Sequence, residues 1–133
     1  MRILSVLTFV VLIFACKDKQ TDVAKNYNPL YDEVMAIHDK VMPEMNTIHT
    51  LKRELKSIQK PDTRDVIIKK IISLDNADEA MMSWMADFKV PENKDKEVEY
   101  LIKEKEAIQL VSDQMYSSIQ QAQMLLDSLK DVK

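Results

Sequence analysis

Hydrophobic residues recur every three or four positions through most of this 133-residue chain, a spacing typical of amphipathic helices. Pro29, Pro61 and Pro91 each open one such run. We expect each proline in the first turn of a helix, where its missing N–H costs nothing. The three apolar stripes contain Leu30, Val34, Ile37, Val41, Ile48, Leu51, Leu55 and Ile58, then Ile67, Ile71, Leu74, Met81, Met85 and Phe88, then Val98, Leu101, Ile108, Met115, Ile119, Ala122, Leu126 and Leu129.

A helix with one broad apolar face has to bury that face against other helices. Three such segments with short connections predict an all-α, antiparallel three-helix bundle over residues 29–133. The chain contains no glycine, which the turns of a sheet protein usually need. Its length allows one domain.

Pro43 lies inside the first segment. It removes one backbone hydrogen bond and clashes with the carbonyl of Asp39, at a cost of about 3 kcal/mol in a helix interior. We expect Met42, the residue before it, to leave α geometry. The first helix is therefore predicted to kink or split into residues 30–42 and 43–59, which would give a four-helix count.

The N-terminus reads MRILSVLTFVVLIFAC, with Arg2 followed by an apolar run from residue 3 to residue 14. This pattern is typical of a signal peptide. The run is shorter than the roughly 20 residues that a membrane-spanning helix needs. We therefore expect residues 1–15 to be a cleaved leader.

Ile13, Ala15 and Cys16 resemble the lipobox of bacterial lipoproteins: an aliphatic residue, a tolerant position, a small residue and the cysteine. The resemblance implies that Cys16 receives a diacylglyceryl group and becomes the first residue after cleavage. Since each buried CH₂ contributes about 0.8 kcal/mol, two or three acyl chains would hold the protein on a membrane. The alternative is an ordinary secretory signal that leaves a lone thiol in an oxidising compartment.

Residues 16–28 would be the lipidated cysteine and a polar tether, with a reach of about 40 Å at full extension. The sequence CKDK partly resembles the signal after the cysteine in surface-exported lipoproteins of Bacteroidetes. We expect the protein in the cell envelope, at the outer membrane, on its periplasmic face or at the cell surface.

Removing residues 1–15 takes away only Arg2 among the charged residues, so the net charge changes from −3 to −4. That mild acidity argues against nucleic acid binding.

Methionines and both histidines form a second stripe, one position away from the apolar stripe of the first segment. Its members, spaced by 3, 4, 3 and 4, are Met35, His38, Met42, Met45 and His49. If the helices pair antiparallel around Pro61, position 81 faces 41 and position 85 faces 37. The segment MMSWM, residues 81–85, would then lie level with this stripe.

Thioether sulfur and imidazole are donors that suit Cu(I) or Ag(I). The candidate ligands are His38, Met42, Met45, Met81 and Met85. Trp84 would lie over the bound cation, and a non-covalent haem held by His and Met is a variant of the same idea. The alternative is a plain core, because methionine fills the irregular gaps that a kink leaves. His38 would then donate to a carbonyl freed near Pro43 or lie in water.

The chain has few residues of the types that usually act in catalysis, with two histidines and one cysteine. The chain lacks the paired Glu-x-x-His motifs of di-iron bundles, a glycine-rich phosphate loop and a nucleophile elbow. We therefore expect a non-enzymatic binding or structural module.

The third helix is predicted to run for about 38 residues, or nearly 60 Å, and to outlast its partners. Residues 115–130 would then pair with another protein or a second copy as a coiled coil. The alternative is that this end folds back over the bundle or frays.

Two segments, YDEVMAIHDKVMPEMNTI and ADEAMMSWMADFKVP, carry His-Asp-x-x-Met-Pro-x-Met and Met-Met-x-Trp-Met motifs. They resemble short lipoproteins of Bacteroidetes, mainly flavobacteria, that are commonly labelled "viral A-type inclusion protein". The resemblance covers most of residues 30–91. It implies a lipoprotein with a helical fold and supplies no catalytic residues.

Overall fold

The computed structural model describes residues 28–131. Within them the chain forms four helices and no strand: α1 (Pro29–Val41), α2 (Glu44–Ser57), α3 (Arg64–Asp87) and α4 (Lys94–Asp131). The predicted leader, the lipidation site Cys16 and the tether as far as residue 27 lie outside the described residues.

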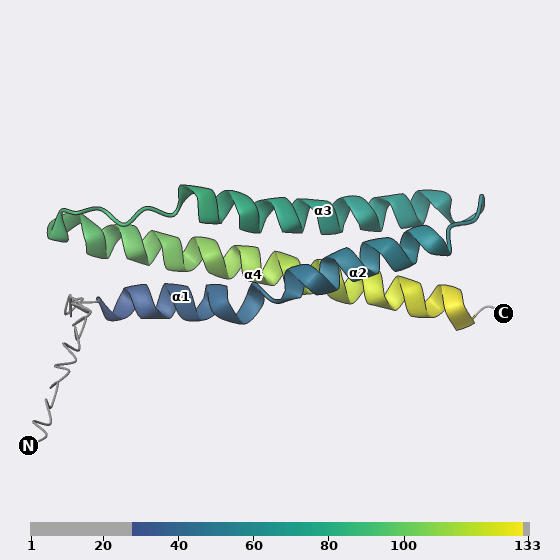
Figure 1. Ribbon diagram of the computed structural model, residues 1–133, viewed down its shortest axis with the longest axis horizontal. Helices are drawn as coiled ribbons and strands as arrows, with labels where there is room; N and C mark the ends of the chain where they lie inside the picture. Colours follow the sequence, from purple (N-terminus) through teal and green to yellow (C-terminus); the bar gives the residue numbers. More distant parts are fainter. Residues whose placement is uncertain (1–27, 132–133) are drawn as a thin grey trace, which may run out of the picture.

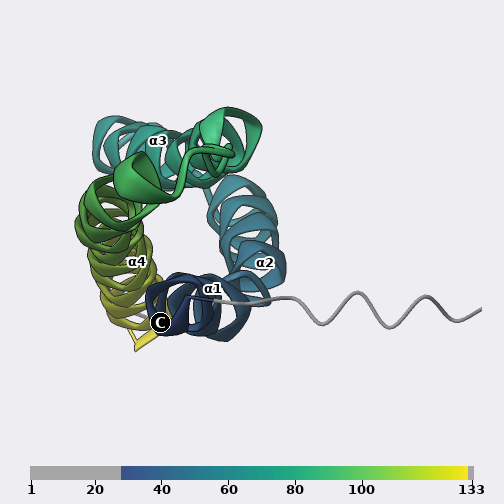
Figure 2. The same cartoon turned by 90° about the vertical axis from the view of Figure 1, so that its left-hand side faces the viewer.

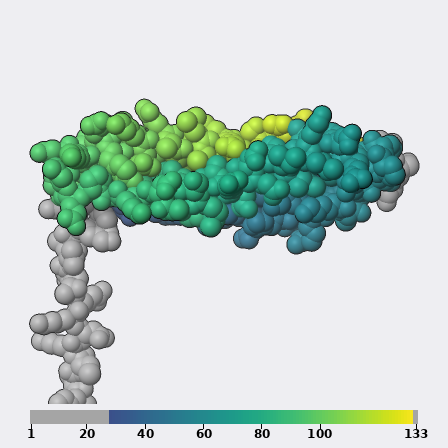
Figure 3. All heavy atoms as spheres, turned by 90° about the horizontal axis from the view of Figure 1, so that it is seen from above, coloured from purple at the N-terminus to yellow at the C-terminus, as the bar shows by residue number. Residues whose placement is uncertain are grey.

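The helices form an antiparallel bundle in which α1 and α2 act as one bent helix (Figure 1). They follow one another along one side, α3 returns, and α4 runs the length of the molecule. The end-on view shows α4 between α3 and α1, and α4 contacts all three other helices (Figure 2). The atoms fill an elongated rod (Figure 3). The all-α, three-helix prediction is confirmed.

The first helix breaks at Pro43, as predicted, but the expected departure of Met42 from α geometry is wrong. Met42 has φ −54° and ψ −39°, and its N–H still donates to the His38 carbonyl at 2.8 Å. The N–H of Met45 then donates to the Met42 carbonyl, and that of Asn46 to the Pro43 carbonyl, both at 3.2 Å. This three-residue spacing belongs to a tightened helical turn, so the chain accommodates the proline without an extended residue.

Pro29 occupies the first turn of α1, as predicted. The side-chain oxygen of Asn28 accepts a hydrogen bond from the Leu30 N–H at 3.1 Å and caps the helix. An asparagine at this position satisfies one of the backbone donors that a helix start leaves unpaired.

Pro61 and Pro91 do not lie in the first turn of a helix, because α3 and α4 each begin three residues later. The side-chain oxygen of Asn93 accepts from the Asp95 N–H at 2.9 Å, so this capping residue sets the start of α4. Before α3, the Thr63 hydroxyl accepts from the Lys60 N–H at 3.2 Å and closes a turn around Pro61. Both prolines therefore belong to the connections.

The core is formed by members of the predicted stripes, together with Ala77 and Trp84, which the stripes did not include. Its buried apolar members are Val34, Val41, Ile48, Leu51, Leu55, Ile67, Leu74, Ala77, Met81, Trp84, Leu101, Ile108, Met115, Ala122 and Leu126. Val98 is an exception, since it is 46% exposed while the neighbouring Glu97 is 7% exposed. The Glu97 carboxylate is paired with Lys94 at 2.8 Å, so a charge can lie on the inner side of this first turn.

The predicted length of the last helix is confirmed, since α4 has 38 residues against 24 in α3, but the expectation that its end projects beyond its partners is wrong. Leu126 is buried near its end, and Lys130 forms an ion pair with Glu54 of α2 at 3.0 Å. Since α2 follows α1 along the bundle, the C-terminal part of α4 lies beside α2 (Figure 1). No helix between residues 28 and 131 is both long and apolar enough to cross a bilayer.

Candidate metal site

His38 and Met85 meet between α1 and α3. The Nε2 atom of His38 lies 3.3 Å from the Met85 sulfur, although the two residues are 47 positions apart in the sequence. Position 38 therefore faces position 85, close to the register expected from pairing around Pro61. The His38 side chain is largely buried, so its orientation is determined by the helices around it.

The second nitrogen of His38, Nδ1, lies 2.9 Å from the exposed carboxylate of Asp39. A neutral imidazole carries one proton, and a carboxylate can only accept. Asp39 therefore holds the proton on Nδ1, which leaves the Nε2 lone pair facing the Met85 sulfur. Metal-binding histidines are commonly oriented in this way, by a carboxylate on the nitrogen that does not bind the metal.

Beside His38 an open pocket of about 570 Å³ follows the break between α1 and α2. Met42 and Met45, both partly buried, contribute two of its walls. The full lining is His38, Asp39, Met42, Pro43, Met45 and Asn46. Two further thioethers thus line the same pocket as His38.

Met81, the remaining predicted ligand, is fully buried in the core and does not line this pocket. It lies one turn of α3 before Met85, in a helix whose buried face packs against α2 and α4. The structure therefore brings four of the five predicted residues into one region and keeps Met81 as core.

Trp84 packs against the imidazole of His38, with 5.7 Å between the ring centroids. Its indole N–H donates to a carboxylate oxygen of Glu104 on α4 at 2.8 Å. Sequence reasoning missed Glu104. The signal was the tryptophan itself, because a buried indole N–H usually has a hydrogen-bond acceptor.

Aromatic rings continue from Trp84 towards the end of the bundle. Phe88 stacks on Trp84 at a centroid distance of 4.8 Å, and Tyr31 and Tyr100 lie 6.1 and 6.0 Å from Phe88. The Tyr100 hydroxyl accepts from the Lys89 N–H at 2.6 Å. Burial raises the pKa of Tyr100, and the nearby Glu104 carboxylate adds to the rise. This wall fixes the side of His38 that faces α3 and α4.

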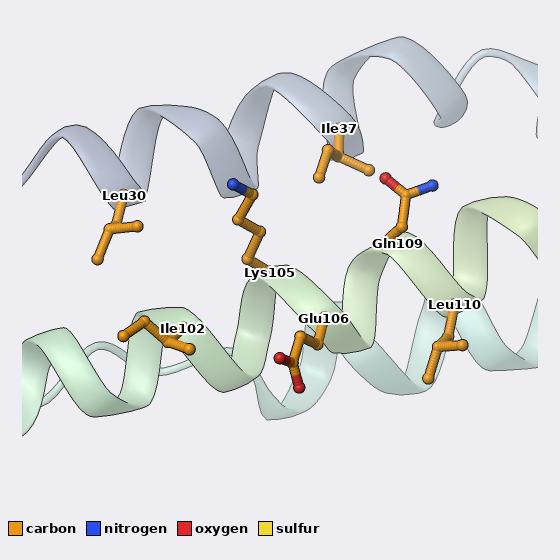
Figure 4. Close-up of a pocket in the computed structure, with 7 residues that line it drawn as sticks. All are labelled: Leu30, Ile37, Ile102, Lys105, Glu106, Gln109 and Leu110. Atoms are coloured by element: carbon orange, nitrogen blue, oxygen red, sulfur yellow. The ribbon is translucent and has the colours of Figure 1, made fainter.

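A separate groove of about 600 Å³ lies between α1 and α4 (Figure 4). Leu30 and Ile37 line it from α1, and Ile102 and Leu110 from α4. Leu110 is 70% exposed, which is unusual for a leucine on a helix packed in a bundle. The sequence stripes did not predict this groove, since neither Ile102 nor Leu110 belongs to the principal buried face of α4.

Among residues 28–131 no group of three or more His, Cys, Asp or Glu side chains is arranged to hold a metal ion. A scan against family models and searches of curated proteins and solved structures found no match to this chain.

Proposed function

We propose that this chain is a bacterial envelope lipoprotein whose helical bundle binds Cu(I) and has no enzymatic activity. The observation that supports metal binding is the pair His38 Nε2 and Met85 Sδ at 3.3 Å, with the Asp39 carboxylate 2.9 Å from the opposite ring nitrogen. The support for the lipoprotein assignment is the apolar N-terminal run that is followed by Ala15 and Cys16.

The donors match the metal in type and spacing. An imidazole nitrogen and a sulfur that share one metal, with bonds of about 2.0–2.3 Å, lie about 3.5 Å apart at a tetrahedral angle. Met42 and Met45 would supply further sulfur ligands, because they line the pocket that also contains His38. Thioethers have no proton to lose, so the site keeps its sulfur donors at acidic pH, and soft sulfur favours Cu(I) over harder ions.

The test is a titration with Cu(I) under reducing conditions against a coloured competing chelator. The full chain with Cys16→Ser, kept in detergent, removes the one thiol that would compete for the ion. We expect one bound Cu(I), and a loss of at least tenfold in affinity, about 1.4 kcal/mol, for His38→Ala and for Met85→Leu.

Met82→Leu is the matched control, since Met82 is on the same helix but exposed. It should bind Cu(I) as tightly as the parent chain. Equal affinity in the His38, Met85 and Met82 variants would remove the copper proposal.

A second candidate is a structural module that self-associates through α4. It is supported by the exposed apolar side chains of α4, namely Ile102 and Leu110 at the groove and Met124 within residues 115–130. A second copy of the chain would cover them. Sedimentation of the full chain over a wide concentration range tests this candidate, and a monomer throughout would exclude it.

A further inference from the structure

Asp78 on α3 carries an unpaired polar atom. Its Oδ1 is buried and has no hydrogen-bond partner, and among residues 28–131 no other side-chain nitrogen or oxygen is in this condition. The nearest opposite group is the Nε2 of His49 on α2, at 3.9 Å. That separation exceeds a hydrogen bond. An unpaired carboxylate oxygen in such a place destabilises the fold unless something binds it.

The next turn of the same interface has a cation opposite the carboxylate. Lys52, three residues after His49 on α2, forms an ion pair with Asp75, three residues before Asp78 on α3. There an ammonium group neutralises the carboxylate. At Asp78 the facing side chain is an imidazole, which has no charge to offer in its neutral form. The α2–α3 interface therefore has a carboxylate without a cation at the level of His49.

The separation of the two atoms also bears on what lies between them. A direct charge-assisted hydrogen bond between the two groups would be about 2.7–2.9 Å long. The observed 3.9 Å is longer than that and is close to the distance between two ligand atoms that share one metal ion.

We propose that His49 and Asp78 form a second metal site, one that takes a divalent transition-metal ion of the Zn²⁺ class. Imidazole nitrogen and carboxylate oxygen are common Zn²⁺ ligands, and with bonds of about 2.0–2.2 Å they lie about 3.4 Å apart around a tetrahedral ion. The His49 side chain is 53% exposed and that of Asp78 is 21% exposed. A small rotation of His49 closes the difference, and water completes the coordination from the open side.

This site is independent of the Cu(I) proposal. It uses nitrogen and oxygen donors between α2 and α3, whereas the first site uses His38 and sulfur between α1 and α3. Because only two protein ligands hold the ion, Zn²⁺ should bind more weakly here than at zinc sites with three or four protein ligands. Zn²⁺ is also the appropriate probe, since thioethers are poor ligands for it.

The experiment is a calorimetric titration of the full chain with Cys16→Ser, in detergent, with Zn²⁺. We expect one bound ion, and a loss of at least tenfold in affinity for His49→Ala and for Asp78→Asn. Asp75→Asn is the matched control, because it removes a carboxylate from the same interface and should leave Zn²⁺ affinity unchanged. His38→Ala should also leave it unchanged.

Thermal unfolding gives a second readout. Zn²⁺ should raise the Tm of the parent chain and of the Asp75→Asn variant, since an ion that binds only the folded state stabilises it. It should leave the Tm of His49→Ala unchanged. Absence of Zn²⁺ binding by the parent chain, or equal affinity after His49→Ala, would overturn the proposal. Loss of Zn²⁺ binding in His38→Ala would do the same, by placing the ion at the first site.

Discussion

At the scale of single residues, buried polar groups determine how the aromatic wall beside His38 is held. Trp84 is large and mostly buried, yet its indole N–H reaches Glu104 on another helix at 2.8 Å. Without that acceptor the N–H would be removed from water with no partner, which costs more than the hydrogen bond contributes. The contact ties α3 to α4 at the level of His38.

Glu104→Ala should therefore lower the free energy of unfolding by about 1–3 kcal/mol, the cost of an unsatisfied buried donor. Urea unfolding followed by Trp84 fluorescence measures it. Glu104→Gln keeps an acceptor oxygen and should lose less. Glu106→Ala, an exposed site nearby, should change the stability little. A Glu104→Ala chain as stable as the parent would show that the indole finds another partner.

Tyr100, in the same aromatic wall, makes the stability of the fold depend on pH. Burial raises the pKa of its hydroxyl, so the folded chain holds this proton more tightly than the unfolded chain does. Stability should therefore fall as pH rises from the ordinary tyrosine pKa of about 10 through the raised value. Urea unfolding at neutral and alkaline pH measures the fall. In Tyr100→Phe this part of the alkaline loss should be absent, and an identical pH dependence in both chains would contradict the assignment.

At the scale of elements, the sequence predicted where helices break better than where they begin. Pro43 lacks an N–H, so the break follows from its chemistry alone. The starts of α3 and α4 depend on which residue caps the first turn. For α4 that residue is Asn93 and not Pro91. The spacing of apolar residues gives no information about capping. Val98 was misassigned for a related reason, because Lys94 pairs with Glu97 and lets that glutamate take the inner position in the first turn of α4.

Asn93→Ala should cost about 1 kcal/mol of stability, because it removes the cap of α4. Pro91→Ala should cost less, since Pro91 lies in the connection before the helix. Chemical unfolding of the two variants compares them directly. A larger loss for Pro91→Ala would mean that the proline, rather than the asparagine, sets the start of α4.

At the scale of the whole molecule, the antiparallel register could be predicted from the sequence, and it brought His38 to Met85. The predicted projection of the end of α4 is wrong, because α2 continues the first helix beyond Pro43 and Glu54 of α2 pairs with Lys130 near that end. The sequence did not predict the contact of Trp84 with Glu104, because this contact joins α3 to α4 and the predicted register related only the first two segments. Pairing of residues 115–130 with another chain stays a prediction.

Leu126→Ala tests whether the end of α4 is part of the bundle. Since Leu126 is buried, its truncation should cost about 2–5 kcal/mol. Met124→Ala, two residues away and exposed, should change the stability little. Thermal or chemical unfolding distinguishes them. Equal effects would mean that this end of the helix does not pack as described.

The position of α4 also constrains how the protein can be made. Each of the other three helices packs on it, and it is the last helix of the described chain to leave the ribosome. Until it arrives, the earlier helices have no closed core and expose their apolar faces. The native bundle of the described residues can therefore be completed only after α4 has been synthesised.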